Sequence, residues 1–436
     1  MVSSQKNYDF FSAEERTVPL WLNTSLIFLF TTFVVFRLYM RDVFHYFEPF
    51  FYLLLLYSCF RYGVGLRRLF LVVLIVAIAI PVLSWLMLLQ DFSRENVLHV
   101  RPEDFLDKFI YLFMGFFLYL NKKKIPLFLL LASIVVLCIP FATGGGIAEI
   151  KKGLSGERVD FGLVAIRTAL LFGLVFVGYT IYAFFSKQRL SFRLALVGLS
   201  LLCLMIIFVT QTRSAVVGLV FFLLFLVYSF FKEGISLRKK LYFGLLLLLL
   251  TATAYVSGLA NPLLNRFELE AQTFTKFYEK RQDFSELPDS SMGLRLQFWR
   301  AGIEYGMDRP ALGWGYRGGN TVMELSGTIS PDNTFINTVH NGYLELFVRY
   351  GFFGLIFFVG VMTVVLFYFY KSVKLGLVPR WISFYIPGSM IYFNCIAMFT
   401  SDFFYWQSLY AFNIIMAVAA AYAYQAVRHV KVGEAL

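Results

Sequence analysis

The chain has 436 residues, of which 59% are hydrophobic and only 15% charged, and its formal net charge is +12. Soluble domains are about 45–50% apolar and about 25% charged, so this composition excludes a soluble globular enzyme, a disordered chain and a secreted disulfide scaffold. The apolar residues form continuous runs, which disfavours a transmembrane β-barrel, because barrel strands alternate. The composition therefore predicts an all-α, polytopic membrane protein.

A spanning helix needs about 20 apolar residues, and runs of this kind predict about twelve transmembrane helices. The expected spans are residues 19–38, 46–60, 69–90, 108–120, 125–141, 162–185, 194–210, 214–231, 241–258, 343–370, 381–399 and 405–426. No small-residue cleavage site follows the first run, so we expect it to be a retained anchor. The cysteines lie inside apolar runs and indicate neither a disulfide framework nor a metal site.

Lys and Arg gather in alternate connections, as the positive-inside rule predicts for cytoplasmic loops. Lys122, Lys123 and Lys124 lie in one such connection, and Lys187 and Arg189 in another. The alternation predicts that both termini are cytoplasmic. It also explains the basic net charge without a nucleic-acid partner.

One connection, residues 259–342, is much longer than the others and faces outward. We therefore expect three regions: residues 1–258 with nine spans, the loop subdomain 259–342, and residues 343–436 with three spans. Phenylalanines at helical spacing predict an amphipathic helix in the loop, either capping the bundle or touching lipid. They are Phe267, Phe274, Phe277 and Phe284.

Arg213 lies between two expected spans with almost no connecting loop, in the sequence Gln211-Thr212-Arg213-Ser214. Charged groups at membrane depth are costly and usually functional. The spacing places this guanidinium at or just below the outer interface, facing protein or a wet cavity. The alternative is an interfacial arginine that extends its head group to water. The interior of the other expected spans is almost bare of ionisable groups, with Arg167 the main exception.

A second cluster lies in the outward loop, where Arg295, Trp299 and Arg300 follow Gly293. On a helix Arg295 and Trp299 share a face at i and i+4, while Arg300 points elsewhere. Arginine suits a diphosphate because its planar guanidinium donates two hydrogen bonds and keeps its charge. The glycine-rich stretch 310–315 either exposes backbone N–H groups to an anion or forms a simple turn.

His340 stands where the outward loop enters an expected span. A helix N-terminus disfavours the imidazolium, so a neutral imidazole here can act as a general base. Glu345 lies one turn beyond Asn341 and can orient polar partners or a ligand. The alternative is a histidine that only caps the helix or lies at the interface.

The outward segments contain no HExxH sequence, no paired DxD sequence and no Cys/His array. No P-loop or other nucleotide-binding element occurs on the inner side. We therefore expect chemistry without a metal ion, cofactor or nucleotide. Such an enzyme needs an activated substrate that is delivered through the membrane.

The chain resembles the O-antigen ligase and polymerase superfamily of bacterial inner-membrane glycosyltransferases. The polar pair Ser401-Asp402 near the last outer turn fits the family pattern. Three separated elements carry the resemblance: Gln211-Thr212-Arg213-Ser214, Gly293-x-Arg295 with Trp299 and residues 310–315, and His340-Asn341-x-x-x-Glu345.

The resemblance implies a fold like the C-type membrane glycosyltransferases, with one large periplasmic loop that contains helices. It implies metal-independent, inverting transfer of O-antigen from undecaprenyl pyrophosphate onto lipid A–core at the periplasmic face. By the same resemblance Arg213 and Arg295 bind the pyrophosphate, and His340 is the base or positions the acceptor hydroxyl. The residues expected to bind substrate beside them are Trp299, Arg300, Asn341 and Glu345.

Two other functions stay open at this point. An O-antigen polymerase uses the same donor with a lipid-linked glycan as acceptor, and sequence motifs separate it poorly from a ligase. A transporter of lipid-linked sugars also suits about twelve spans with both termini inside. The absence of internal repeats and the concentration of polar residues on one face speak against transport.

Overall fold

The structure is a computed structural model. It describes residues 18–433 except for 40–45, 64–65, 90–100, 143–144, 233–243, 245–263, 266, 269–270, 273–274, 276–290 and 328–337. This part of the chain is built from helices and contains no β-strand. The all-α prediction is therefore confirmed for the described residues.

The helices include segments within the expected spans and shorter ones between them. In order they are α1 (Leu20–Phe36), α3 (Glu48–Tyr62), α4 (Arg67–Leu88), α5 (Pro102–Leu106), α6 (Ile110–Leu120), α7 (Ile125–Leu137), α8 (Ile139–Ala142), α9 (Ile147–Leu154), α10 (Ala165–Phe185), α11 (Leu190–Val209), α12 (Arg213–Lys232), α15 (Ser291–Gly306), α16 (Gly318–Ser326), α17 (Gly342–Lys374), α18 (Arg380–Ala397) and α19 (Trp406–Gly433). Short 3₁₀ helices are η2 (Asp107–Phe109), η3 (Lys122–Lys124) and η6 (Asp402–Phe404). The expected span 241–258 lies outside the described residues.

Within the described part of the chain, six helices are long and apolar enough to cross a membrane: α4, α10, α11, α12, α17 and α19. Helix α1 is shorter, with 17 residues, and α3 and α6 have 15 and 11. The chain is thus a multi-pass membrane protein. The total of about twelve spans stays a prediction.

Small residues let the central helices approach closely. Helix α19 packs against α6 and α17, and its residues from Leu409 to Tyr424 are all buried. A Cβ added at Gly115 of α6 would lie only 2.5 Å from the Cβ of Ala420, so this approach requires glycine. In lipid, where burial of apolar surface drives association little, such close packing holds helices together.

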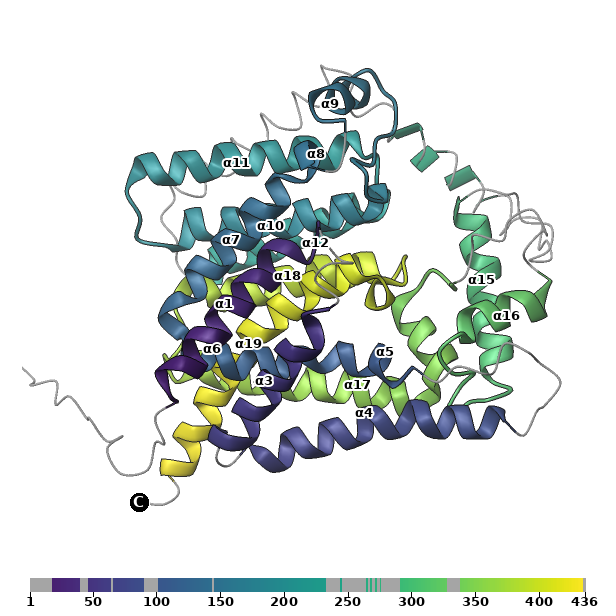
Figure 1. Cartoon of the computed structure of the whole chain (residues 1–436). Coiled ribbons are helices and arrows are strands. Elements are labelled where there is room, and N and C mark those ends of the chain that lie inside the picture. The colour runs from purple at the N-terminus through teal and green to yellow at the C-terminus, as the bar shows by residue number, and fades with distance from the viewer. Residues whose placement is uncertain are drawn as a thin grey trace, which may run out of the picture.

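The two ends of the bundle differ (Figure 1). Helices α15 and α16 lie together at one end, which we call the capped end. The C-terminus and the connection between α10 and α11 lie at the other end, which we call the basic end because it carries Lys122–Lys124, Lys187 and Arg189. Helices α4 and α17 run side by side between the two ends.

Helices α15 and α16 pack on the first turns of α17 through a second, smaller hydrophobic core. The core consists of Phe298, Ala301, Val322, Met323, Val339 and Val348. The Trp314 indole N–H donates to the Tyr305 carbonyl at 2.7 Å, which ties the connection between the two helices to α15. Both helices belong to the expected loop subdomain, whereas Phe274, Phe277 and Phe284 of the expected amphipathic helix lie outside the described residues.

Helix α17 is broken at Gly351, whose φ of 64° and ψ of −168° are not helical. The break leaves carbonyl groups of the preceding turn without helical partners. The backbone N–H groups of Trp314 and Gly315 donate to the carbonyls of Val348 and Arg349, both at 2.8 Å. These two amides are therefore occupied, and the anion-binding interpretation of the glycine-rich stretch does not hold for them.

Residues 310–315 also form a hydrogen bond with the second half of α17, after the break at Gly351. The N–H of Phe352 donates to the Pro310 carbonyl at 2.7 Å. A Cβ added at Gly351 would lie 2.1 Å from the carbonyl oxygen of Ala311, so no other residue fits without movement of the backbone. Residues 310–315 thus fasten the capped end to a spanning helix.

Candidate active site

His340 immediately precedes α17 and has a left-handed backbone, with φ of 53°. This conformation costs a non-glycine residue about 1–3 kcal/mol, so the surrounding structure must hold it. Asn341 is the residue that caps α17, because its Oδ1 accepts hydrogen bonds from the N–H groups of Tyr343 and Leu344, both at 3.1 Å. The cap expected as one role for His340 therefore belongs to Asn341.

The imidazole of His340 lies against α15. Its ring stacks on Phe298, with centroids 5.7 Å apart and an angle of 25° between the planes. Burial, and then the nearby charge of Arg295, lower the pKa of His340 to about 4. The imidazole is therefore neutral at pH 7 and keeps a nitrogen lone pair for a proton.

Two side chains of α15 near this histidine, Arg295 and Trp299, are partly buried. The Nη1 of Arg295 donates to Ser291 Oγ at 3.1 Å, and its charge acts on His340. The ring of Trp299 packs on Phe399 after the end of α18, with centroids 6.1 Å apart. In the described residues, the buried indole N–H of Trp299 has no hydrogen-bond partner. This N–H group is therefore available to donate a hydrogen bond to a ligand.

Arg213 is the first residue of α12 and is partly buried. The preceding Gln211 is left-handed, with φ of 51°, and its side-chain amide donates to the Gly156 carbonyl at 2.7 Å, which fixes the turn between α11 and α12. Helix α12 packs antiparallel along α18, so its first turn lies at the capped end. The structure thus brings Arg213 to the end of the bundle that carries Arg295 and His340.

Arg300 differs from its neighbours on α15. Its side chain is 48% exposed, and its Nε lies 3.7 Å from the carboxylate of Glu304, one turn further along the helix. An exposed pair of this spacing contributes only about 0.3–0.5 kcal/mol. The pair with Glu304 therefore holds the Arg300 guanidinium only weakly.

Glu345 lies at the centre of the first turns of α17 and is 0% exposed. One carboxylate oxygen accepts a hydrogen bond from the N–H of Val339 at 2.8 Å, and the other pairs with the Nε of Arg349 at 2.6 Å. Because Val339 directly precedes His340, Glu345 holds the backbone of the histidine. The expected contact of Glu345 with substrate stays a prediction.

Behind Glu345 lies a buried ionic cluster that was not expected from the sequence. Oδ2 of Asp104 lies 3.8 Å from Arg349 Nη1 and 3.5 Å from Lys108 Nζ, and accepts a hydrogen bond from Tyr350 at 2.7 Å. Burial raises the pKa of Asp104, but the charges of Lys108 and Arg349 outweigh it and lower the pKa below its ordinary value. The carboxylate therefore stays ionised and links α5 to α17.

This cluster corrects one inference from the sequence. Arg167 is not the main ionisable residue within the expected spans, because Lys108 and Arg349 are buried charges inside two others. The sequence contains a pattern that indicates this cluster, because acidic and basic residues are spaced at i and i+4. The pairs are Asp104 with Lys108 and Glu345 with Arg349.

Arg167 and Asp402 belong to a further polar group, where α10 begins and α19 follows η6. The Arg167 guanidinium lies over the ring of Tyr405 at 3.7 Å. Asp402 is buried and accepts hydrogen bonds from Thr400 and, at 2.8 Å, from Ser408. Burial raises the pKa of Asp402 more than these bonds and Arg167 lower it.

Within the described residues, no group of three or more His, Cys, Asp or Glu side chains is placed to hold a metal ion. No curated protein matches the chain. Residues 198–359 match the family model described as O-antigen ligase, a segment that runs from α11 into α17 and contains Arg213, Arg295 and His340. This part of the chain is therefore similar to the O-antigen ligase family.

Proposed function

We propose that the protein is an O-antigen ligase. It transfers O-antigen from undecaprenyl pyrophosphate onto lipid A–core during lipopolysaccharide biosynthesis, in the bacterial inner membrane with the capped end in the periplasm. The observation that carries the proposal is the neutral imidazole of His340 beside the guanidinium of Arg295, at the end of the bundle where α12 begins with Arg213.

The arginines supply the positive charge that a diphosphate leaving group needs. As the bond at the anomeric carbon breaks, negative charge grows on the pyrophosphate, and guanidinium groups in a partly buried site stabilise it. The unpaired indole N–H of Trp299 adds an uncharged group that can donate a hydrogen bond to the pyrophosphate. Arg300, on the exposed side of α15, is placed to meet the donor from the surface.

His340 activates the acceptor. Its imidazole takes the proton of the acceptor hydroxyl while the hydroxyl oxygen attacks the anomeric carbon opposite the pyrophosphate. The new C–O bond forms as the old one breaks, so the configuration inverts and the pyrophosphate leaves with the bonding electrons. General-base assistance of this kind contributes about 10²–10⁴-fold. Asn341 uses only its side-chain oxygen to cap α17, so its side-chain amide N–H groups are placed to orient the acceptor.

The test is a strain that lacks the gene, examined for its lipid-linked glycans. Loss of a ligase leaves long polymer on undecaprenyl pyrophosphate, whereas loss of a polymerase leaves a single repeat on lipid A–core. Wild-type protein should restore smooth lipopolysaccharide, and His340→Ala should not. His429→Ala, near the basic end, is the matched control and should behave as wild type. Smooth lipopolysaccharide in the His340→Ala strain would contradict the assigned base.

A second arm separates transfer from transport. Purified protein in detergent, mixed with both lipid substrates, should form the glycosidic product, because flipping has no meaning without a membrane. Product formation should persist in EDTA, since the positive charge comes from arginine. No product under any condition favours the transporter, and inhibition by EDTA contradicts the metal-independent reaction.

A further inference from the structure

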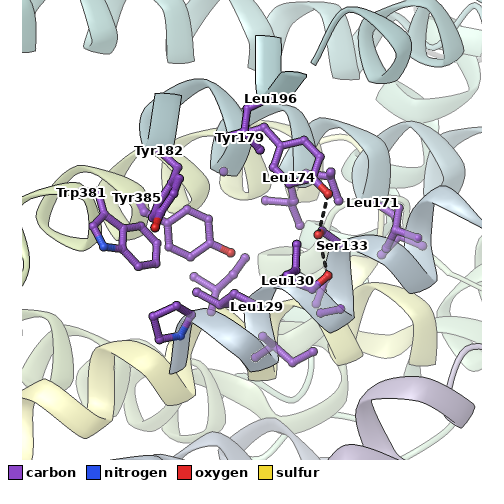
Figure 2. Close-up of a pocket in the computed structure, with 18 of the residues that line it drawn as sticks. Leu129, Leu130, Ser133, Leu171, Leu174, Tyr179, Tyr182, Leu196, Trp381 and Tyr385 are labelled. Carbon is purple, nitrogen blue, oxygen red and sulfur yellow. Dashed lines mark hydrogen bonds between the residues drawn. The ribbon is translucent and has the colours of Figure 1, made fainter. Parts of the chain in front are cut away.

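A cavity of about 260 Å³ lies between α7, α10, α11, α18 and α19, and none of the candidate site residues lines it. Figure 2 shows side chains that line it, among them Ser133, Leu196 and Tyr385. Its lining on α10 runs from Tyr182, near the basic end of that helix, to Leu171. The cavity therefore extends from the basic end into the middle of the bundle.

The lining suits hydrocarbon better than water, because most of its side chains are aliphatic or aromatic. The hydroxyls of Ser133 and Tyr179 bond to each other at 2.7 Å, and the hydroxyl of Tyr410 donates to the Val34 carbonyl at 2.7 Å. An apolar cavity of about 150 Å³ stays dry and takes up an apolar molecule. This larger cavity has room for part of a lipid chain.

The cavity opens sideways onto the surface of the bundle. Leu127 and Leu130 of α7 and Phe192 of α11 belong to its lining, yet they are 52%, 44% and 46% exposed. Exposed apolar side chains on a membrane bundle face lipid, so the lining is continuous with the surface that contacts the bilayer. A lipid chain can enter without crossing a polar surface.

Aromatic rings form the rim at the basic end. The ring of Tyr182 lies 4.8 Å from that of Trp381 and 6.4 Å from that of Phe192, measured between centroids. The end of α10 and the starts of α11 and α18 therefore meet at this rim. Tyrosine and tryptophan are enriched at the depth of lipid head groups, so the rim marks the membrane interface.

Basic side chains follow the same helix ends. We call them the basic cluster; they are Lys123 and Lys124 before α7, Lys187 and Arg189 between α10 and α11, and Arg380 at the start of α18. All are exposed, and residues 121–127, 186–193 and 378–382 contain no acidic side chain. Basic groups at a membrane surface attract anionic head groups.

The depth of the cavity matches the thickness of the hydrocarbon layer in one leaflet. Leu171 and Tyr182 are separated by about 16 Å along the helix axis. The bilayer hydrocarbon is about 30 Å thick, so one leaflet occupies about half of that. A chain whose head group lies at the rim would thus end near the inner limit of the cavity.

We propose that this cavity is a binding site for an anionic phospholipid of the leaflet at the basic end. One acyl chain fills the cavity between α7, α10 and α11, and the basic cluster holds the phosphate. The bound lipid acts as part of the packing of α7 against its neighbours. The inference depends on the membrane location of the chain and not on glycan transfer.

The first test fills the cavity. A Cβ at Gly178 meets only the ring of Tyr385, at 3.4 Å, so Gly178→Leu places its side chain in the cavity without a backbone clash. Gly198→Leu on α11 is the matched control, because a Cβ there has nothing within 4 Å. Native mass spectrometry with added phosphatidylglycerol measures the bound lipid. Binding should fall about tenfold or more in Gly178→Leu, the effect of displacing about two methylene groups, and not in Gly198→Leu.

The second test concerns the head group. Lys123→Glu with Lys187→Glu should weaken phosphatidylglycerol binding, whereas Lys151→Glu with Lys152→Glu on α9 should not. Wild-type protein should bind phosphatidylglycerol in preference to phosphatidylethanolamine. Equal binding of the two lipids, preferential binding of a polyprenyl phosphate, or unchanged binding in Gly178→Leu would each overturn the proposal.

A measurement on the wild-type protein keeps the proposal testable if a variant fails to fold. Phosphatidylglycerol with a photoreactive group in its acyl chain should label peptides of α7 and α10 that line the cavity, among them those with Leu129 and Leu174. Labelling confined to other helices would overturn the proposal.

Discussion

At the scale of single residues, the depressed pKa of His340 makes a prediction about pH. The free enzyme holds this imidazole neutral above about pH 4, so kcat/KM is lost only as the pH falls through that value. The acid limb of kcat/KM should therefore lie well below the ordinary histidine pKa of about 6.5. Bound pyrophosphate favours the imidazolium, so the acid limb of kcat should lie at higher pH.

Rates of transfer in detergent, measured with both lipid substrates between pH 4 and 8, check this profile. A kcat/KM limb near 6.5 would mean that His340 is solvated in the free enzyme. The residual rate of His340→Ala should show no acid limb from this group.

The unpaired indole N–H of Trp299 makes a second prediction. Trp299→Phe keeps an aromatic ring against Phe399 and removes only the indole N–H group. If this N–H binds the pyrophosphate of the lipid-linked substrate, kcat/KM falls about tenfold. This is the effect of about 1.5 kcal/mol for a hydrogen bond to a charged group. Thermal stability should not fall, because no protein partner is lost.

Trp314→Phe is the control for this comparison. Its indole N–H is already bonded to the Tyr305 carbonyl, so the change should cost about 1 kcal/mol of stability and leave kcat/KM nearly unchanged. The reverse pattern in the two variants would exclude Trp299 from donor binding.

At the scale of secondary-structure elements, the break in α17 determines where the histidine lies. Gly351→Ala puts a Cβ 2.1 Å from the Ala311 carbonyl oxygen and forces an unfavourable backbone conformation. We expect a loss of at least about 2 kcal/mol in stability, together with reduced transfer, because residues 310–315 separate from α17. Thermal unfolding in detergent measures the first effect and glycan transfer the second.

Gly360→Ala is the matched control on the same helix, since nothing lies within 4 Å of a Cβ at that position. Replacing a glycine inside a regular helix should stabilise the protein by about 0.5–1 kcal/mol. Equal unfolding temperatures for the two variants would show that the contact at Gly351 is dispensable.

At the scale of the whole molecule, the separation of the capped end from the basic end predicts opposite sides of the membrane. In a variant whose native cysteines are replaced by serine, Met307→Cys at the capped end should react with a membrane-impermeant maleimide in cells with a permeabilised outer membrane. Lys187→Cys at the basic end should react only after the inner membrane is opened. Reaction of both while the inner membrane is still closed would contradict the assigned topology.

The sequence predicted the helices of this bundle better than the contacts between them. Apolar runs locate α4 and α10 because each helix shows its own composition. The role of residues 310–315 could not be predicted, since their partners are backbone groups on either side of a helix break about 35–40 residues further along the chain. The lipid cavity was also hidden, because five helices form it and no single one shows it.

The pairing of Asp104 with α17 also has a consequence for biosynthesis. Its partner Tyr350 lies 246 residues later in the chain, and Arg349 is adjacent to it. At bacterial synthesis rates about 10–50 s pass between the appearance of the two segments. During that interval Asp104 lacks both Arg349 and Tyr350, so its carboxylate has only part of its final set of partners. A nascent chain stalled before residue 349 should therefore be a substrate for quality-control proteases, even though more than half of its helices have already been made.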